Sequence, residues 1–328
     1  MNCIDVFNGD ADGICALQQL RLHHPQPGAR LITGVKRDVA LLSRLAGTTA
    51  SRITVLDISL DRNREALEEL LANRNSVFYA DHHYSGAIPD SVFLEAYIDP
   101  SPLLCTALII DRLLAGKFRP WAIAGAFGDN LDEVAIGHAE ALGLTGDDIT
   151  ILRETGRLLN YNGYGLSVDD LLIHPADLFG EVHQYADPFS LHRDSTILRK
   201  LRGGYEQDMA KAANIQPFRI YPAGRVFQFP QESWSNRVIG VFSNQVARDQ
   251  PEMAHATVLT NLDGSLMVSV RAPLTTRRGA DTLCRQFASG GGRAAAAGIN
   301  QLPVADLETF LSRFAQFFSP SNGSLGLL

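Results

Sequence analysis

The sequence predicts an α/β protein of about two domains, in which an N-terminal parallel sheet with helices on both faces precedes a smaller α+β domain. The chain has 328 residues, of which 45% are hydrophobic, and this is enough for a sizeable core in each domain. Over roughly the first 145 residues, apolar runs of strand length alternate with helical patterns, as they do in parallel sheets. After residue 217, several short strand-like runs come before the last helical patterns, which is typical of an α+β domain.

The N-terminal elements are predicted from hydrophobic periodicity. Short apolar runs between polar residues predict strands at 3–7, 30–35, 52–56 and 77–80. Apolar residues at helical spacing predict helices at 13–23, 38–45, 62–71, 102–114 and 120–127. In the first helix the apolar stripe contains Ile14, Leu17 and Leu20, and a proline-rich breaker at 25–28 ends the pattern.

The middle of the chain is predicted to be helical with two breaks. A helix is expected from Thr145 to Leu159, because a capping sequence precedes apolar residues at helical spacing. Residues 160–165 are expected to form a turn that anchors two tyrosines, with stacking on a base as the alternative. A connecting helix is expected at 198–213, with an interruption at 203–204.

The second domain is expected to begin near Pro217. Its predicted strands are 219–221, 225–229, 238–242, 255–260 and 266–271, and its predicted helices are 280–287 and 304–317. The predicted limits are 1–195 for the first domain, 196–216 for the connection, 217–320 for the second domain and 321–328 for a flexible tail.

Charge and hydropathy restrict the function and the location. The formal net charge of -7 argues against a stable complex with long nucleic acids, because surfaces that hold them carry a basic excess. No run reaches the ~18 to 20 apolar residues of a membrane span, and the first residues lack the basic start of a secretory signal. We therefore expect a cytoplasmic protein that does not contact membranes.

Acidic residues follow several predicted elements of the N-terminal domain. They are Asp10 and Asp12 after 3–7, Asp57 after 52–56, Asp81 with His82 and His83 after 77–80, and Asp129 after 120–127. The carboxyl ends of parallel strands meet at one edge of a sheet, so these side chains are expected to lie together. A single Asp can be a helix cap, but the joint pattern with two histidines favours a site for two divalent cations.

These motifs resemble the DHH phosphoesterase superfamily, subfamily 1, in which a DHH domain precedes a DHHA1 domain. The matching segments are Asp10-Ala11-Asp12-Gly13, Asp57, Asp81-His82-His83, Asp129 and the glycine motif at 290–298. They occur in the family's order and span roughly residues 1 to 320. The resemblance implies an active-site cleft between the two domains.

The resemblance also implies roles for the site residues. One cation would be held by Asp12, Asp57, His82 and Asp129, and the other by Asp10 and Asp57 with a contribution from Asn8. Asp81 would orient its neighbours, and His83 would face the substrate phosphate. Mn²⁺ is the expected cation, with Mg²⁺ or Co²⁺ as alternatives, and a hydroxide activated by two cations would attack phosphorus.

Two positions depart from the family pattern. Asn8 stands where the family has a metal-binding histidine, and a neutral amide oxygen is a poorer ligand for transition metals. Arg293 stands where the family's glycine motif has a histidine, and its guanidinium suits phosphate. We expect substrate phosphate to be bound by Arg271, Arg293 and the backbone of Gly290, Gly291 and Gly292, with a helix N-terminus behind the glycines.

The expected activity is that of a metal-dependent phosphodiesterase. By family analogy its substrates are short linear dinucleotides such as pGpG or pApA, left from cyclic dinucleotide signalling, or nanoRNA, and its products are 5′ mononucleotides. A RecJ-like single-strand 5′ exonuclease and a phosphatase for 3′-phosphoadenosine 5′-phosphate are alternatives within enzymes. A nucleotide-binding sensor with a weakened metal site is an alternative of another class, because Asn8 and Arg293 replace two family histidines. Beyond the substrate, the expected partner is a second copy of this chain in a homodimer.

Overall fold

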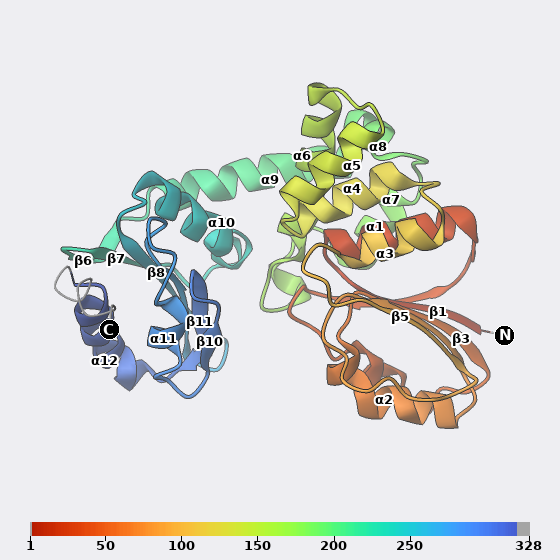
Figure 1. The fold of residues 1–328 in the computed structure, drawn as a ribbon, viewed down its shortest axis with the longest axis horizontal. Helices are drawn as coiled ribbons and strands as arrows, with labels where there is room; N and C mark the ends of the chain where they lie inside the picture. The colour runs from red at the N-terminus through yellow and green to blue at the C-terminus, as the bar shows by residue number, and fades with distance from the viewer. Residues whose placement is uncertain (1, 320–328) are drawn as a thin grey trace. The chain divides into compact units, whose positions relative to one another are not determined.

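The computed structural model describes residues 2–319 and divides into two compact units (Figure 1). Unit 1 is Met1–Tyr205 and unit 2 is Glu206–Leu328. The boundary falls inside α9 (Thr196–Ala213), so the predicted connecting segment belongs to a helix. The tail predicted at 321–328 lies outside the described residues.

Unit 1 is built on a parallel sheet of five strands, which confirms the predicted fold class. The strand order is β2-β1-β3-β4-β5. The strands are β1 (Asn2–Asn8), β2 (Arg30–Gly34), β3 (Ser51–Leu56), β4 (Ser76–Asp81) and β5 (Leu94–Ile98). The first four were predicted. β5 was not, because it is only partly buried along its length and has no clear apolar run.

Helices cover both faces of this sheet (Figure 1). One face is covered by α1 (Ala11–His23) and α3 (Thr106–Leu113), with α4 (Arg119–Gly128) packed against both, and the other by η1 (Leu41–Leu45) and α2 (Leu60–Ala72). Strand side chains alternate between the two cores, since Phe7 packs toward α1 while Val6 packs toward η1 and α2. The helix predicted at 38–45 is shorter than expected, because Asp38 instead lies in a turn and pairs with Arg44.

A further helical layer contains α5 (Asp132–Ala141), α6 (Gly146–Gly163) and α8 (Pro188–Asp194), whereas α7 (Pro175–Val182) packs on the sheet against β2 and α1. The turn predicted to begin at 160 is wrong, because α6 continues to Gly163. Asn162 is fully buried there, and its amide bonds both the carbonyl and the N–H of Ile173. These contacts outweigh the low helix propensity of asparagine. No helix within residues 2–319 combines the length and the hydropathy that crossing a membrane needs.

Unit 2 contains a mixed sheet of six strands in the order β10-β11-β9-β8-β7-β6. The strands are β6 (Pro217–Tyr221), β7 (Gly224–Gln228), β8 (Ala254–Thr260), β9 (Leu266–Arg271), β10 (Gly290–Gly292) and β11 (Ala296–Leu302). The helices are α10 (Ser233–Asp249), α11 (Ala280–Cys284) and α12 (Leu307–Phe317), with a short turn η3 (Val304–Asp306). A core of apolar residues from the strands, α11 and α12 joins them, as expected of an α+β domain.

Two predictions near unit 2 are wrong. The strand predicted at 238–242 lies inside α10, where Val238, Phe242 and Val246 are buried at helical spacing. A short apolar run cannot by itself distinguish a buried strand from a buried helix. The interruption predicted at 203–204 is absent from α9. A Cβ atom at Gly204 would lie 2.2 Å from a methyl group of Leu172, so the glycine permits close packing rather than a break.

Candidate metal centre

The structure brings together the acidic residues that follow separate elements of unit 1. Asp10 is the N-cap of α1, directly after β1. Asp57 follows β3, and Asp81 is the last residue of β4. Asp129 is the C-cap of α4. All of these positions lie at the carboxyl ends of the parallel strands or against them, as the sequence predicts.

His82 lies at the point where three carboxylates converge. Its Nε2 atom is 3.5 Å from Oδ1 of Asp57, 3.7 Å from Oδ2 of Asp129 and 3.9 Å from Oδ2 of Asp12. The ligand atoms of Asp12, His82 and Asp129 all lie within 4.8 Å of one another, and so do those of Asp57, His82 and His83. Three carboxylates and one imidazole form a donor set that suits a divalent cation with mixed oxygen and nitrogen preference.

Asp12 is held in place by the first turn of α3. Its two carboxylate oxygens accept hydrogen bonds of 2.7 Å from the backbone N–H groups of Thr106 and Ala107. The helix predicted at 102–114 therefore begins only at Thr106, where Asp12 satisfies its free N–H groups. The Thr106 hydroxyl donates to Oδ1 of Asp57 at 3.1 Å, so one helix start orients two of the carboxylates.

Asp57 adopts an unusual backbone conformation, with φ of +58°. Non-glycine residues rarely occupy this left-handed region, and strain of this kind concentrates at functional sites. The side chain is buried. Burial raises the pKa of the Asp57 carboxyl well above its ordinary value, and the negative charges of Asp12, Asp10 and Asp129 raise it further. A cation would relieve this repulsion.

Lys36 is a member of the site that the sequence analysis missed. It lies two residues after β2, which pairs with β1, and so at the same edge of the sheet as Asp10. Its ammonium is 2.5 Å from Oδ2 of Asp10 and 3.3 Å from Oδ1 of Asp129. Its position after a predicted strand was the available signal, but a single lysine there is common in any α/β protein.

The chain also supplies neutral contacts to Lys36. The ammonium donates to Oδ1 of Asn160 at 3.3 Å, and the Asn160 amide donates to the Tyr164 hydroxyl at 3.1 Å. The ammonium is 5.9 Å from the centre of the Tyr164 ring. Asn160 contributes because α6 continues through it, so the error at the end of α6 concealed this part of the site.

Charge pairing changes the titration of the residues around Lys36. Burial would raise the pKa of Asp10, but Lys36 and the N–H of Gly13 hold that pKa below its ordinary value. Burial opposes the charge on Lys36, but Asp10 above all keeps the pKa of the ammonium well above its ordinary value. Lys36 and Asp10 are therefore both charged at neutral pH.

Asn8 contacts the backbone of Lys36 through its amide nitrogen. Its amide donates to the Lys36 carbonyl at 3.2 Å, and its Oδ1 atom has no hydrogen-bond partner among the described residues. The Lys36 N–H in turn donates to the carbonyl of Gly163. The loop that carries Lys36 is therefore tied to the end of β1 and to the end of α6.

Asp81 and His83 form a separate pair beside the carboxylates. Nδ1 of His83 is 2.7 Å from Oδ1 of Asp81. This hydrogen bond raises the pKa of His83 above its ordinary value, against the opposing effect of burial. Asp81 is fully buried, whereas the His83 side chain is 43% exposed. The supporting role expected of Asp81 stays a prediction.

The two cation positions implied by the sequence fit the structure unequally. Asp12, Asp57, His82 and Asp129 converge, and their chemistry fits a divalent cation. The other set fits less well, because the ammonium of Lys36 already pairs with Asp10. The structure thus favours one of the two positions.

The glycine run of unit 2 is a strand, which corrects the expectation of a helix N-terminus behind it. Gly290, Gly291 and Gly292 form β10, which pairs with β11. A Cβ atom at Gly290 would lie 1.7 Å from the carbonyl oxygen of Cys284, so this position requires glycine. The run is followed by a turn and then by β11, so its backbone N–H groups are not backed by a helix dipole.

Arg293 and Arg271 lie close to this run within the sheet of unit 2. Arg293 is exposed in the turn between β10 and β11, where its backbone bonds that of Ala296. Arg271 ends β9 opposite Ala296, and its guanidinium donates to Asn244 and Ser269. The predicted substrate-binding residues of unit 2 are therefore neighbours, and their role stays a prediction.

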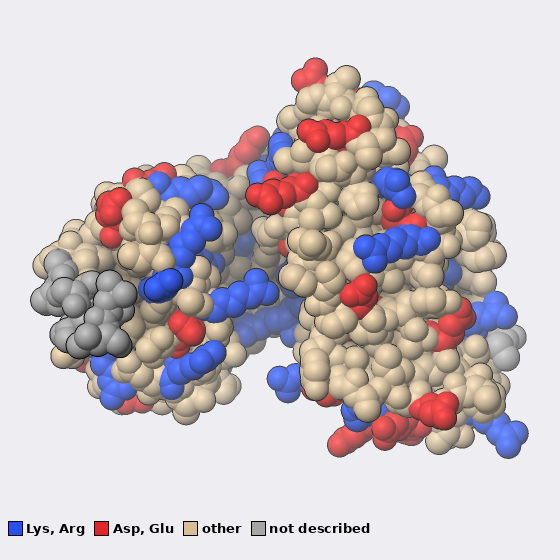
Figure 2. All heavy atoms as spheres, in the orientation of Figure 1, with Lys and Arg blue, Asp and Glu red and all other residues tan. Residues whose placement is uncertain are grey.

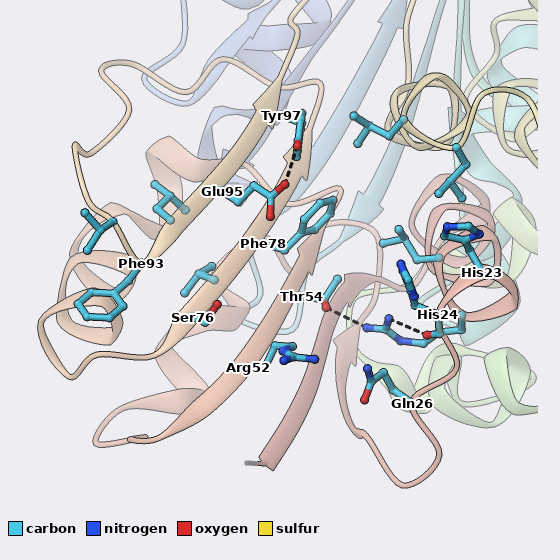
Figure 3. Close-up of a pocket in the computed structure, with 17 residues that line it drawn as sticks. His23, His24, Gln26, Arg52, Thr54, Ser76, Phe78, Phe93, Glu95 and Tyr97 are labelled. Carbon is cyan, nitrogen blue, oxygen red and sulfur yellow. Dashed lines mark hydrogen bonds between the residues drawn. The ribbon is translucent and has the colours of Figure 1, made fainter.

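A cavity of about 630 Å³ lies elsewhere in unit 1 (Figure 3). It is lined by Phe78, Glu95 and Tyr97 on the sheet and by His23 and His24 at the end of α1. Arg52 and Ser76, near the starts of β3 and β4, also line it. The carboxylates lie at the opposite ends of those strands, so this cavity is not part of the metal centre.

Solved structures share this fold at low sequence identity. A structure of exonuclease RecJ bound to manganese matches with a TM-score of 0.61 and 17% identity, over 97% of this chain and 90% of that one. RecJ from Thermus thermophilus in complex with Mn²⁺ matches at 0.56 and 17%, over 96% and 52%. PggH, a pGpG-specific phosphodiesterase from Vibrio cholerae, matches at 0.55 and 15%, over 96% and 98%. No protein-family model and no curated protein matches the sequence.

Proposed function

We propose that the protein is a phosphodiesterase that requires a divalent cation and hydrolyses short linear oligonucleotides to 5′ mononucleotides. The observation that carries this proposal is the convergence of His82 with carboxylate oxygens of Asp12, Asp57 and Asp129 at one edge of the sheet. The fold shared with a manganese-bound exonuclease and with a pGpG-specific phosphodiesterase supports it.

The cation would be held by Asp12, Asp57, His82 and Asp129. When bound, it would lower the pKa of a water molecule and stabilise negative charge on a phosphoryl oxygen. Mn²⁺ is our first candidate because the set mixes imidazole and carboxylate, and Mg²⁺ and Co²⁺ are the alternatives. The resemblance implies two cations, and the convergence of these four residues supports the position that they form.

The chain's own residues position this chemistry. The first turn of α3 fixes Asp12 through two N–H groups and orients Asp57 through the Thr106 hydroxyl. Asp81 holds the His83 ring, which is partly exposed and can donate to a phosphate oxygen. Such outer contacts keep ligands in place before substrate arrives.

Charge distribution supports a small anionic substrate. Asp and Glu outnumber Lys and Arg in unit 1, whereas the reverse holds in unit 2. Figure 2 shows several Lys and Arg side chains over the visible face of unit 2, with few acidic residues among them. We propose that Arg271, Arg293 and the β10 backbone of unit 2 contribute to phosphate binding. The acidic side chains of unit 1 would disfavour the binding of long nucleic acids.

The lengths covered do not separate a short substrate from a long strand, since PggH is covered to 98% and the two RecJ structures to 90% and 52%. A short substrate is favoured instead by the pGpG specificity of PggH and by the net charge of -7 of this chain. We therefore rank linear dinucleotides such as pGpG and pApA first, and single-strand exonuclease activity second.

A length series tests the substrate class. Labelled strands from two to about twenty nucleotides are incubated with Mn²⁺, and the products are separated. We expect release of 5′ mononucleotides at a rate that falls steeply with length. Undiminished cleavage of the longest strand would instead support a RecJ-like exonuclease. Tight binding of dinucleotides without turnover, with each of Mn²⁺, Mg²⁺ and Co²⁺, would support a nucleotide sensor. This second candidate is specific because Lys36 pairs with Asp10, an expected metal ligand.

A further inference from the structure

We propose that the ammonium of Lys36 permanently takes the place of one of the two expected cations, so that this centre binds a single divalent cation. The inference rests on the proposed function, since it concerns the same metal centre. It differs from the two-cation expectation in assigning a side chain of the protein to the position beside Asp10.

The ammonium of Lys36 has as many hydrogen-bond acceptors within reach as it has N–H donors. A lysine ammonium has three N–H donors. The three acceptors within reach are Oδ2 of Asp10 at 2.5 Å, Oδ1 of Asp129 at 3.3 Å and Oδ1 of Asn160 at 3.3 Å. Each donor therefore has an acceptor, and two of the three acceptors are carboxylates.

The backbone of Lys36 is fixed as well as its side chain. Its N–H donates to the Gly163 carbonyl at 2.8 Å, and its carbonyl accepts from the Asn8 amide at 3.2 Å. A Cβ atom at Gly163 would lie 2.9 Å from Cβ of Asp10, so α6 approaches Asp10 closely only because glycine stands there. The loop, β1 and α6 together hold the ammonium against Asp10.

Asn8 removes the ligand that would favour a metal over the ammonium. An imidazole at this position would offer a strong donor for a transition metal, whereas the amide donates to Lys36. A cation beside Asp10 would also meet the positive charge of Lys36 at short range, where repulsion is strong. Asn8 and Lys36 therefore both disfavour a metal ion beside Asp10.

Asp129 shows how one cation and one ammonium can share the carboxylates. Its Oδ1 atom faces Lys36, while its Oδ2 atom is 3.7 Å from Nε2 of His82. Asp12, Asp57 and His82 remain available together with that second oxygen. Lys36 is thus a positioning residue, which neutralises Asp10 and orients Asp129.

Counting bound Mn²⁺ by titration, with electron paramagnetic resonance of the loaded protein, tests the inference without any substrate. We expect one Mn²⁺ per chain in the wild type, with a spectrum free of exchange coupling. We expect the double variant N8H/K36M, which restores an imidazole and removes the ammonium, to bind two coupled Mn²⁺ ions. Arg37→Met is the matched control in the same loop, where the side chain is exposed, and we expect it to bind one.

Two outcomes would overturn the inference. One is a wild-type protein that binds two coupled ions, and this result needs no variant to fold. The other is a folded N8H/K36M variant, checked by circular dichroism, that still binds only one ion. The proposed function fails separately: a protein that binds one Mn²⁺ and hydrolyses no oligonucleotide would contradict it and leave the assignment of Lys36 intact.

Discussion

Nδ1 of His83 lies 2.7 Å from Oδ1 of Asp81, a buried carboxylate at the end of β4. This hydrogen bond fixes the plane and the tautomer of an imidazole that remains partly exposed. Asp81→Asn keeps the shape of the side chain but removes its charge. We expect kcat/KM for a linear dinucleotide to fall by about 10 to 100-fold, the usual effect of losing such a supporting contact.

The control for this variant is Asp99→Asn, since Asp99 lies just beyond the end of β5 and is half exposed. We expect it to retain wild-type kcat/KM. Melting curves of both variants separate a loss of activity from a loss of folding. Equal activity in Asp81→Asn and the control would show that the charge of Asp81 does not contribute.

A buried ion pair joins the last turn of α1 to β1. It lies away from the carboxyl ends of the strands, where the metal centre is. Arg21 donates to Oδ2 of Asp5 at 2.8 Å and to Oδ1 at 2.5 Å, and also to the Thr54 hydroxyl. Arg21→Met would leave the Asp5 charge buried without a partner. We expect the free energy of unfolding to fall by about 3 kcal/mol, measured by urea denaturation.

The exposed pair of Arg193 and Asp194 is the comparison, because both side chains are more than half exposed. Arg193→Met should change the free energy of unfolding by less than about 1 kcal/mol. Similar losses of unfolding free energy in Arg21→Met and Arg193→Met would contradict the view that burial determines how much stability an ion pair provides.

Close packing between α4 and α6 depends on Gly156. A Cβ atom there would lie 2.0 Å from the carbonyl oxygen of Ala124. Gly156→Ala should lower the free energy of unfolding by roughly 1 to 3 kcal/mol, because the helices must separate. Since Asp129 caps α4 and Asn160 lies on α6, we also expect weaker Mn²⁺ binding.

Gly137 is the matched control, because it is exposed on α5 and a Cβ atom there would meet nothing within 4 Å. Gly137→Ala should raise the free energy of unfolding by about 0.5 to 1 kcal/mol through helix propensity. Denaturant unfolding of the two variants should therefore show shifts of opposite sign, and shifts of the same sign would contradict the packing argument.

His255 makes the stability of unit 2 depend on pH. Burial lowers its pKa to about 4, and its Nδ1 atom has no hydrogen-bond partner among the described residues. The unfolded chain takes up a proton near pH 6.5, whereas the folded chain does so only near pH 4. Stability should therefore fall as pH drops from about 6.5 to about 4, by roughly 3 kcal/mol from this residue.

Comparing the wild type with His255→Gln isolates this contribution from that of the carboxylates. As pH falls through this interval, the wild type should lose unfolding free energy relative to His255→Gln. A pH-independent difference for His255→Gln would show that the histidine does not titrate as argued.

The close approach of the acidic residues could be predicted from the sequence where chemistry and topology coincide. Asp10, Asp57 and Asp81 follow predicted strands, and parallel topology requires such ends to meet at one edge. Lys36 follows a strand in the same way, but a lysine after a strand has no distinctive pattern. Only its distance to Asp10 identifies it.

The errors in the fold arose where tertiary contacts outweigh local preference. Asn160 and Asn162 disfavour helix, yet α6 continues through them because both side chains find partners across the fold. The run at 238–242 contains apolar residues that suit either a strand or a helix, and only the flanking buried positions of α10 decide. A glycine run has no strand pattern in sequence, and Gly290 lies in β10 because its backbone pairs with β11.

The most direct test of the central claim is the amount of 5′ mononucleotide released from pGpG in the presence of Mn²⁺ by the wild type and by Asp57→Asn. Asp57 is buried and contacts His82, so its loss should weaken the cation site by several kcal/mol. We predict hydrolysis by the wild type and a rate at least about a thousandfold lower in Asp57→Asn, with exposed Asp61→Asn unaffected. Hydrolysis that persists in Asp57→Asn, or none in the wild type, would contradict the account.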